Sequence, residues 1–172
     1  DRFDGIPIVF EGVNDEEYAL EAAKNPLVTG ILEKLSVEKN IDMALKVNPS
    51  ADKVVAILDD SVTGEAERKN FYSAEAKYPE LEFSEINSSE LTTAQLQQAV
   101  SKVDENTILI YIVMSNDGSG KQYTNTQAIR MVVTYSKVPV YRMVEDGIGA
   151  GLLGGNVVSM YKSGEIAAQM AM

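Results

Sequence analysis

Apolar residues gather in short runs along the chain, and these runs alternate with longer segments that mix apolar and polar positions. The strand-like runs lie at residues 6–10, 28–33, 53–58, 81–86, 107–114 and 138–144. The segments at residues 16–24, 37–47, 64–78, 92–103, 126–135 and 157–172 predict helices. The run "TILIYIVM" at 107–114 is the most apolar strand, so we expect it to be central, with Tyr111 in the core.

This alternation of strands and helices predicts the fold class. Apolar strands joined by helices form a parallel sheet that is covered on both faces, and right-handed crossovers make it a doubly wound, three-layer, mostly parallel α/β domain. In such a sheet, ligands bind beyond the carboxyl ends of the strands. Polar segments follow four strand ends, at residues 12–15, 59–64, 115–120 and 145–147. They are candidates for the rim of a ligand site, although surface loops are polar in any case.

Composition narrows the function classes. The chain has 172 residues and a net charge of -11, which argues against nucleic acid and anionic membranes as partners because both require a positive surface. It contains neither histidine nor cysteine, so a Ser-His-Asp triad, a histidine-ligated zinc and thiol chemistry are all excluded. No apolar stretch is long enough to span a membrane. These features favour binding of a small molecule over catalysis, and we expect no cofactor and no metal.

The stretch "LDDSVTGEAER" at residues 58–68 follows a predicted strand and admits several interpretations. It lacks the GxxxxGK[ST] pattern of a phosphate loop. A phospho-receiver domain would also need a lysine at the end of its last strand, where this chain has Val144 and Glu145. Adjacent carboxylates point in opposite directions from an extended backbone, so Asp59 and Asp60 make a poor acid-base pair. Which way Asp59 faces stays open at this point.

The same stretch also predicts a helix start. Ser61 or Thr63 is expected to cap a helix that begins near Gly64, with Glu65 and Glu67 in its first turn. A helix start with hydroxyl groups nearby can also receive a carboxylate group of a ligand.

A glycine-rich segment near the end contains the formal dinucleotide motif GxGxxG at residues 149–154. The nucleotide fingerprint belongs after the first strand of a βαβ unit, whereas this segment follows the last predicted strand. We therefore expect these glycines not to bind a cofactor. We expect them instead to pack tightly against the neighbouring lobe of the two-lobed protein that is inferred below.

Five pieces of the sequence, taken in order and with their spacing, resemble the ABC-transporter substrate-binding-protein family, which has the type I periplasmic-binding fold. The pieces are "IPIVF" at 6–10, "NPLVTG" at 25–30, "LKVNP" at 45–49 before the strand at 53–58, "GGNVV" at 154–158 and "GEIAA" at 164–168. Relatives of this family also occur as sensor domains of bacterial histidine kinases, which act in two-component signalling. The resemblance runs over essentially the whole chain.

The resemblance implies a protein of two lobes that close on a ligand in the cleft between them. Residues 1–35 would be the remnant of the first lobe with a crossing segment, and residues 36–172 most of the second lobe. The implied ligand-binding residues are Asn14, Asp60, Ser61, Thr63, Gly64, Asn116, Asp117, Glu145 and Asp146. For a ligand such as an amino acid, the carboxylate would bind at Ser61, Thr63 and Gly64, and the ammonium at Asp117 or Glu145.

The resemblance also implies partners and a location. The expected partners are a small-molecule ligand and either a transporter permease or the kinase part of the same chain, in an extracytoplasmic and membrane-associated protein. The opening "DRFD" lacks a methionine and a signal pattern, which indicates a piece of a longer protein. We expect such a piece to expose its lobe interface and to self-associate. The alternative function is a flavodoxin-like or receiver-like domain that needs a cofactor or Mg²⁺.

Overall fold

The computed structural model describes residues 5–172. The opening "DRFD", from which we expected a longer protein, lies outside the described residues. The elements are β1 (Ile8–Val13), α1 (Glu16–Ala22), β2 (Val28–Leu32), α2 (Val37–Val47), β3 (Lys53–Leu58), α3 (Val62–Ser73), β4 (Glu82–Asn87), α4 (Thr93–Lys102), β5 (Thr107–Tyr111), α5 (Asn125–Tyr135), β6 (Val140–Arg142) and α6 (Met160–Met170). Two single 3₁₀ turns, η1 (Glu75–Lys77) and η2 (Ser88–Glu90), flank β4. None of the described helices is long and apolar enough to cross a membrane.

The chain forms two compact units. Unit 1 comprises the described residues up to Lys34 together with Val158–Met172, and unit 2 comprises Leu35–Val157. The expected division had placed everything after residue 35 in one lobe. The closing helix α6 lies instead with unit 1, where it contacts β1 and β2. Its half-buried residues recur three and four positions apart and so share one face of α6: Ser163, Gly164, Ile166 and Ala167.

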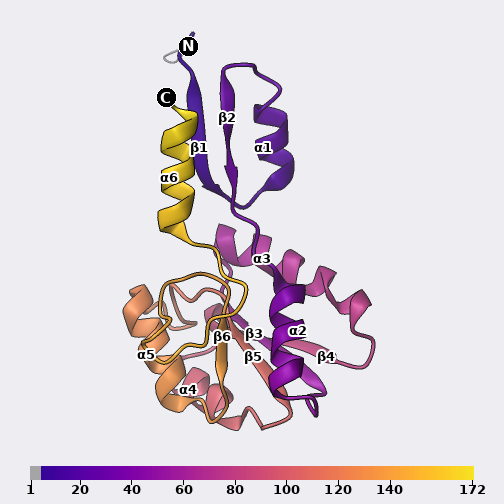
Figure 1. Cartoon of the computed structure of the whole chain (residues 1–172). Coiled ribbons are helices and arrows are strands. Elements are labelled where there is room, and N and C mark those ends of the chain that lie inside the picture. The colour runs from indigo at the N-terminus through magenta and orange to yellow at the C-terminus, as the bar shows by residue number, and fades with distance from the viewer. Residues whose placement is uncertain (1–4) are drawn as a thin grey trace. The chain divides into compact units, whose positions relative to one another are not determined.

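Unit 2 is built on a parallel four-stranded sheet with the strand order β4-β3-β5-β6 (Figure 1). Alternate residues of β3 and β5 point to opposite faces, and both sets are buried. On one face, Ile57, Leu109 and Tyr111 pack in a cluster with apolar residues of α4 and α5. On the other face, α2 contacts β5 and α3 contacts β3. The predicted three-layer, mostly parallel α/β fold is therefore confirmed.

The strands at the end of unit 2 are shorter than their apolar runs. The run at 107–114 contributes only Thr107–Tyr111 to the sheet, although Ile112 and Met114 are also buried. The ladder stops because the last bonds to β3 run from the N–H groups of Ile112 and Val113 to the same carbonyl, that of Ile57. Burial without ladder pairing explains why the hydrophobic pattern overestimates β5 and β6. The expectation that Tyr111 belongs to the core is confirmed, with 1% of it exposed.

The glycine-rich segment after β6 packs on its own unit. Gly147 and Gly151 have φ of 84° and 108°, in the left-handed region that favours glycine. A Cβ at Gly151 would lie 2.5 Å from the side chain of Val133 on α5, and one at Gly147 would lie 2.7 Å from Ile129 on the same helix. These glycines thus seat the segment against α5 of unit 2, and their expected contact with the neighbouring lobe stays a prediction.

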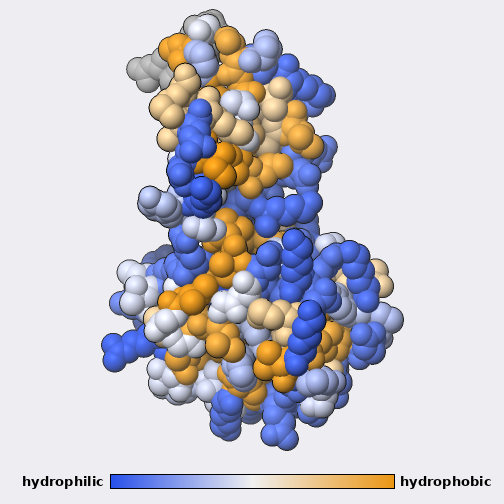
Figure 2. All heavy atoms as spheres, viewed as in Figure 1, coloured by the Kyte–Doolittle hydropathy of each residue, from blue (hydrophilic) through white to orange (hydrophobic). Residues whose placement is uncertain are grey.

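Unit 1 consists of the parallel pair β1 and β2 with α1 and α6. The two strands approach closely at Gly30, where a Cβ would lie 2.3 Å from the carbonyl oxygen of Phe10. Its helix α1 exposes large apolar side chains, 70% of Tyr18 and 58% of Leu20. Hydrophobic residues are frequent on the visible face of unit 1 in Figure 2. The self-association of this chain stays a prediction, for which these side chains are the natural place to look.

Candidate functional site

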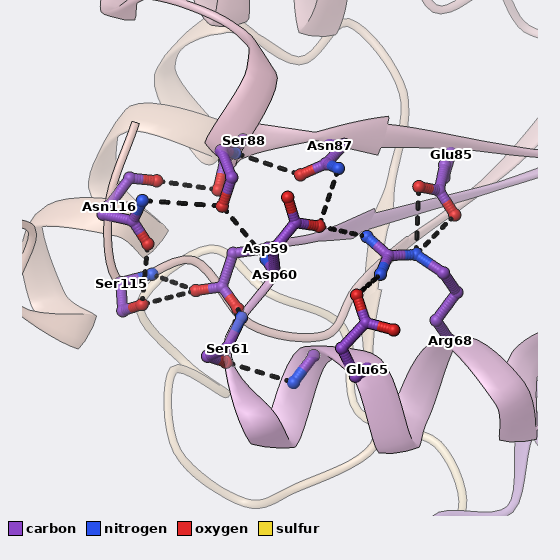
Figure 3. Close-up of polar contacts among 12 residues, drawn as sticks. Asp59, Asp60, Ser61, Glu65, Arg68, Glu85, Asn87, Ser88, Ser115 and Asn116 are labelled. Carbon is purple, nitrogen blue, oxygen red and sulfur yellow. Dashed lines mark hydrogen bonds and ion pairs between the residues drawn. The ribbon is translucent and has the colours of Figure 1, made fainter. Parts of the chain in front are cut away.

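Three strands of the unit 2 sheet end at the same level. In the register of the sheet, Leu58 of β3 pairs with Asn87 of β4, and Ile57 pairs with Tyr111 of β5. The segments that follow these strands therefore begin side by side. We call residues 59–61, 87–89 and 115–116 the carboxyl-edge cluster, and Figure 3 shows their polar contacts. These contacts join the segments after β3, β4 and β5.

Asp59 is the buried centre of this cluster. Its Oδ1 accepts hydrogen bonds from the N–H (3.1 Å) and hydroxyl (2.5 Å) of Ser61, and its Oδ2 accepts from the N–H (2.7 Å) and hydroxyl (2.5 Å) of Ser115. Burial works to raise the pKa of Asp59, but the hydrogen bonds from Ser115 and Ser61 outweigh it and hold the pKa below its ordinary value. Asp59 is thus an ionised residue that joins the end of β3 to the segment after β5.

Asp60, the next residue, faces a different set of partners. Its Oδ1 accepts from Arg68 on α3 and from the side-chain amide of Asn87, both at 2.8 Å. Arg68 also donates to both carboxylate oxygens of Glu85 at 3.1 Å and forms an ion pair with Glu65 (Figure 3). Burial alone would lower the pKa of Arg68, but the three carboxylates raise it, so Arg68 is a permanent cation among them. Asp60 is half-exposed and neutralised.

The segment after β4 belongs to the site and was missed in the sequence. Asn87 binds Asp60, the hydroxyl of Ser88 donates to the carbonyl of Asn116 at 2.8 Å, and the hydroxyl of Ser89 accepts from the N–H of Asp60 at 3.0 Å. The signal was present, because "NSS" at 87–89 directly follows an apolar position at Ile86. The strand-end rule that found the other segments would have found this one. Arg68 carried no such signal, since a helical arginine is usually only a surface charge.

The helix start at α3 is a formed cap. Ser61 is the N-cap, and its hydroxyl accepts from the N–H of Gly64 at 3.1 Å. Gly64 is buried against β3, since a Cβ there would lie 2.0 Å from the carbonyl oxygen of Asp59. The two expected donors, Ser61 and Gly64, therefore already bind each other. Among the described residues, the N–H groups of Val62 and Thr63 donate to no acceptor and stay open in the exposed first turn.

Asn116 is a half-buried member of the cluster, and its carbonyl accepts a hydrogen bond from the hydroxyl of Ser88. Asp117 has a different environment, because it is 1% exposed and holds its own loop. Its Oδ1 accepts from the N–H and hydroxyl of Ser119 and from the N–H of Lys121, while its Oδ2 accepts from the hydroxyls of Thr93 and Tyr123.

These bonds decide the role of Asp117. Hydrogen bonds from Ser119 and Thr93 lower its pKa strongly, which keeps the carboxylate ionised. A buried carboxylate whose two oxygens are saturated by its own loop has no place for a ligand ammonium. The expected ammonium-binding role of Asp117 does not fit this geometry, and Asp117 supports the loop between β5 and α5 instead.

The segment after β6 carries Glu145 and Asp146, both exposed. Asp146 forms an ion pair with Arg142 at 2.8 Å. Arg142 is buried at 7% exposure, donates to the carbonyl oxygens of Tyr111 and Ile112, and stacks on the Tyr111 ring with 4.7 Å to its centroid. Sequence reasoning missed Arg142, which lies inside an apolar strand. Asp146 therefore neutralises a buried cation, while Glu145 faces the solvent.

The remaining expected residue, Asn14, belongs to unit 1. It follows β1 and directly precedes Asp15, whose carboxylate caps α1 by accepting from the N–H of Tyr18 at 2.9 Å. Asn14 and the carboxyl-edge cluster are thus parts of different units.

A hollow of about 270 Å³ lies elsewhere in unit 2, between α4, α5 and the Asp117 loop. Its lining includes Thr93, Lys121, Tyr123 and Arg130. None of the residues expected to bind ligand from the sequence lines it. The carboxyl-edge cluster, where the polar strand ends meet, remains the better candidate site because its position follows from the sheet topology.

Comparison with known proteins decides the family. A family model described as ABC transporter substrate binding protein matches residues 2–172. The chain belongs to this family. The family assignment confirms the resemblance read from the sequence, and it disfavours the flavodoxin-like and receiver-like alternative. No relative was found among curated proteins.

Two solved structures share the fold of this substrate-binding domain. A crystal structure of the ABC domain in complex with L-Trp from Streptococcus pneumonia matches with a TM-score of 0.69 and 17% identity, covering 98% of this chain and 58% of that one. A conserved domain protein from Vibrio cholerae O1 biovar El Tor matches with a TM-score of 0.63 and 15% identity, covering 96% and 56%. The chain thus spans little more than half the length of these relatives.

Proposed function

We propose that this chain is the solute-binding part of an ABC transporter substrate-binding protein, and that the carboxyl-edge cluster forms one side of the ligand site. The observation that carries the proposal is the convergence of three in-register strand ends, each followed by polar residues, in a member of a substrate-binding family. Ligands of open α/β sheets bind at this edge. The role is binding and not catalysis, in keeping with a chain that lacks histidine and cysteine.

The ligand class we propose is a small zwitterion such as an amino acid. The open N–H groups of Val62 and Thr63, with the Thr63 hydroxyl, offer hydrogen bonds to a carboxylate at the positive end of the α3 dipole. Of the two acids expected to bind the ammonium, Asp117 is saturated by its own loop, so we propose Glu145 for this role. The fold relative crystallised with L-Trp supports an amino acid as the first ligand to test.

The setting we propose follows the family. A substrate-binding protein delivers its solute to a permease outside the cytoplasm, and sensor relatives pass the signal to a kinase in the same chain. In either setting, closure of the two lobes on the ligand is the event that the partner detects. Because the chain spans little more than half the length of its fold relatives, these partners are proposals about the whole protein.

Calorimetric titration of the full-length protein with L-Trp and the other amino acids tests the proposal. We expect one ligand to bind, and we expect Thr63→Val and Glu145→Gln each to weaken it by about 10-fold or more, because each removes a hydrogen bond to a charged group. The control is Glu82→Gln, which makes the same change on an exposed acid at the amino end of β4. Unchanged affinity in both site variants would refute the site, and no binding across the panel would refute the ligand class.

A further inference from the structure

The chain passes between its two units twice. The incoming segment leads into α2 of unit 2, and the outgoing segment is bonded to the same helix. The incoming segment enters unit 2 at Leu35 and continues through Ser36 into α2. The outgoing segment leaves unit 2 at Val157, after Gly155 and Asn156. Any change in the relation of the units must therefore act on these two short segments.

Asn40, in the first turns of α2, binds both segments. Its side-chain amide donates to the carbonyl of Ser36 at 2.8 Å and to the carbonyl of Asn156 at 2.9 Å, across 116 positions of sequence. The residue is fully buried. An amide NH₂ has two donors, and here one holds the incoming and the other the outgoing segment.

The packing around Asn40 also ties the connecting segments to unit 2. A Cβ at Gly155 would lie 2.1 Å from the Asn40 Oδ1 and 2.8 Å from the Met43 side chain, so the outgoing backbone rests directly on α2. Asn70 on α3 adds a bond from its amide to the carbonyl of Leu35 at 3.0 Å. The Oδ1 of Asn40 has no hydrogen-bond partner among the described residues. Such a buried acceptor is costly, which indicates that Asn40 is present for its two donors.

We propose that Asn40 is a positioning residue that fixes both connecting segments to unit 2 and thereby limits the motion of the two units about them. Its consequence for ligand binding rests on the proposed function, because a looser connection raises the entropy that lobe closure must remove. The restriction itself concerns the protein without ligand.

A distance measurement without ligand tests the proposal. The chain has no cysteine, so Glu17→Cys on α1 and Gln98→Cys on α4, both exposed, place one spin label in each unit of the full chain. We expect Asn40→Ala to broaden the inter-label distance distribution by about 1.5-fold or more, since two of the bonds that hold the segments are lost. The matched control is Asn48→Ala at the other end of α2, which removes a bond from Asn48 to the Glu105 carbonyl and touches neither segment.

A second variant and a stability measurement make the result of the distance measurement decisive. Gly155→Ala disturbs the same contact from the outgoing segment and should also broaden the distribution, even if Asn40→Ala fails to fold. Urea unfolding of each variant separates loss of stability from loss of restriction, because a merely structural asparagine would lower the midpoint and leave the width unchanged. Equal widths in the parent, Asn40→Ala and Gly155→Ala proteins would overturn the proposal. Titration of the same proteins with L-Trp distinguishes this result from failure of the binding function, since the widths are measured without ligand.

Discussion

Among individual residues, neighbouring acids in this chain have unlike roles. Asp59 and Asp60 are adjacent in sequence, but the first is buried under four hydrogen bonds from Ser61 and Ser115, and the second faces Arg68 at the surface. The alternation of an extended backbone sends the two side chains in opposite directions. Sequence reasoning recognised this divergence, but it left open which way Asp59 faces because its partners on the segment after β5 lie far away in the chain.

Substitution of Asp59 tests its role as the buried link between β3 and the segment after β5. We expect Asp59→Asn to lower the free energy of unfolding by about 2–4 kcal/mol, because one carboxylate oxygen becomes an NH₂ group facing the donors of Ser61 or Ser115. Urea unfolding followed by circular dichroism measures the change. Asp52→Asn is the control, since Asp52 is exposed before the opposite end of β3 and should stay within about 0.5 kcal/mol of the parent.

At the scale of elements, α3 is placed by a glycine. Its first turn lies so close to the end of β3 that Gly64 has no room for a side chain, with the Asp59 carbonyl oxygen 2.0 Å from an ideal Cβ. Glycine within a helix costs about 1 kcal/mol relative to alanine. The close approach of α3 to the sheet must outweigh that cost, because it positions the cap at Ser61 and the ion pairs of Arg68.

Two matched glycine substitutions separate packing from helix propensity. We expect Gly64→Ala to destabilise the protein by about 1–3 kcal/mol, because the clash is with backbone that cannot rotate away. We expect Gly164→Ala in α6 to stabilise it by about 0.5–1 kcal/mol, because the nearest atoms to its Cβ are the Glu11 carboxylate oxygens at 3.8 Å. Thermal unfolding of both variants shows whether each midpoint rises or falls. Shifts in the same direction would contradict the separation of packing from helix propensity.

For the whole molecule, net charge and buried acids act on stability in opposite directions as pH falls. The sequence pI is about 4.4, so acidification from pH 7 first removes the repulsion of a net charge of -11. At pH values below the pI, protonation of the buried acids dominates the change in the free energy of unfolding. The pKa values of Asp59 and Asp117 are lowered in the folded protein, so their contribution is present above the unfolded pKa of about 3.9 and is lost as the pH falls through the folded values.

The resulting pH profile is a test of these two carboxylates. We expect the free energy of unfolding to hold or rise from pH 7 to about 4.4 and then to fall steeply below pH 4. Asp117→Asn removes one of the two acids, so its profile should fall less steeply in the acid range. Urea midpoints at intervals from pH 7 to pH 2 measure both curves. Parallel acid limbs for the two proteins would show that Asp117 does not contribute.

The sequence by itself determined the order and type of the elements, the parallel α/β class and the family, while several element ends, such as those of α3, β5 and β6, differ by a few residues from the predicted ones. The elements and the fold class follow from hydrophobic periodicity and from helix caps, which depend on residues close together in the chain, and the family follows from the resemblance of five short pieces of sequence. It also pointed to the strand ends, because the place where ligands bind is a property of topology.

Only the tertiary structure decided which acids are available to a ligand. The bond from Thr93 to Asp117, the bond from Asn87 to Asp60 and the bond from Asn40 to Asn156 each join residues that are far apart in sequence. The placement of α6 with β1 and β2 is of the same kind. Such contacts depend on how elements pack together, and a local pattern of apolar and polar positions contains no record of which distant side chain a given residue will meet.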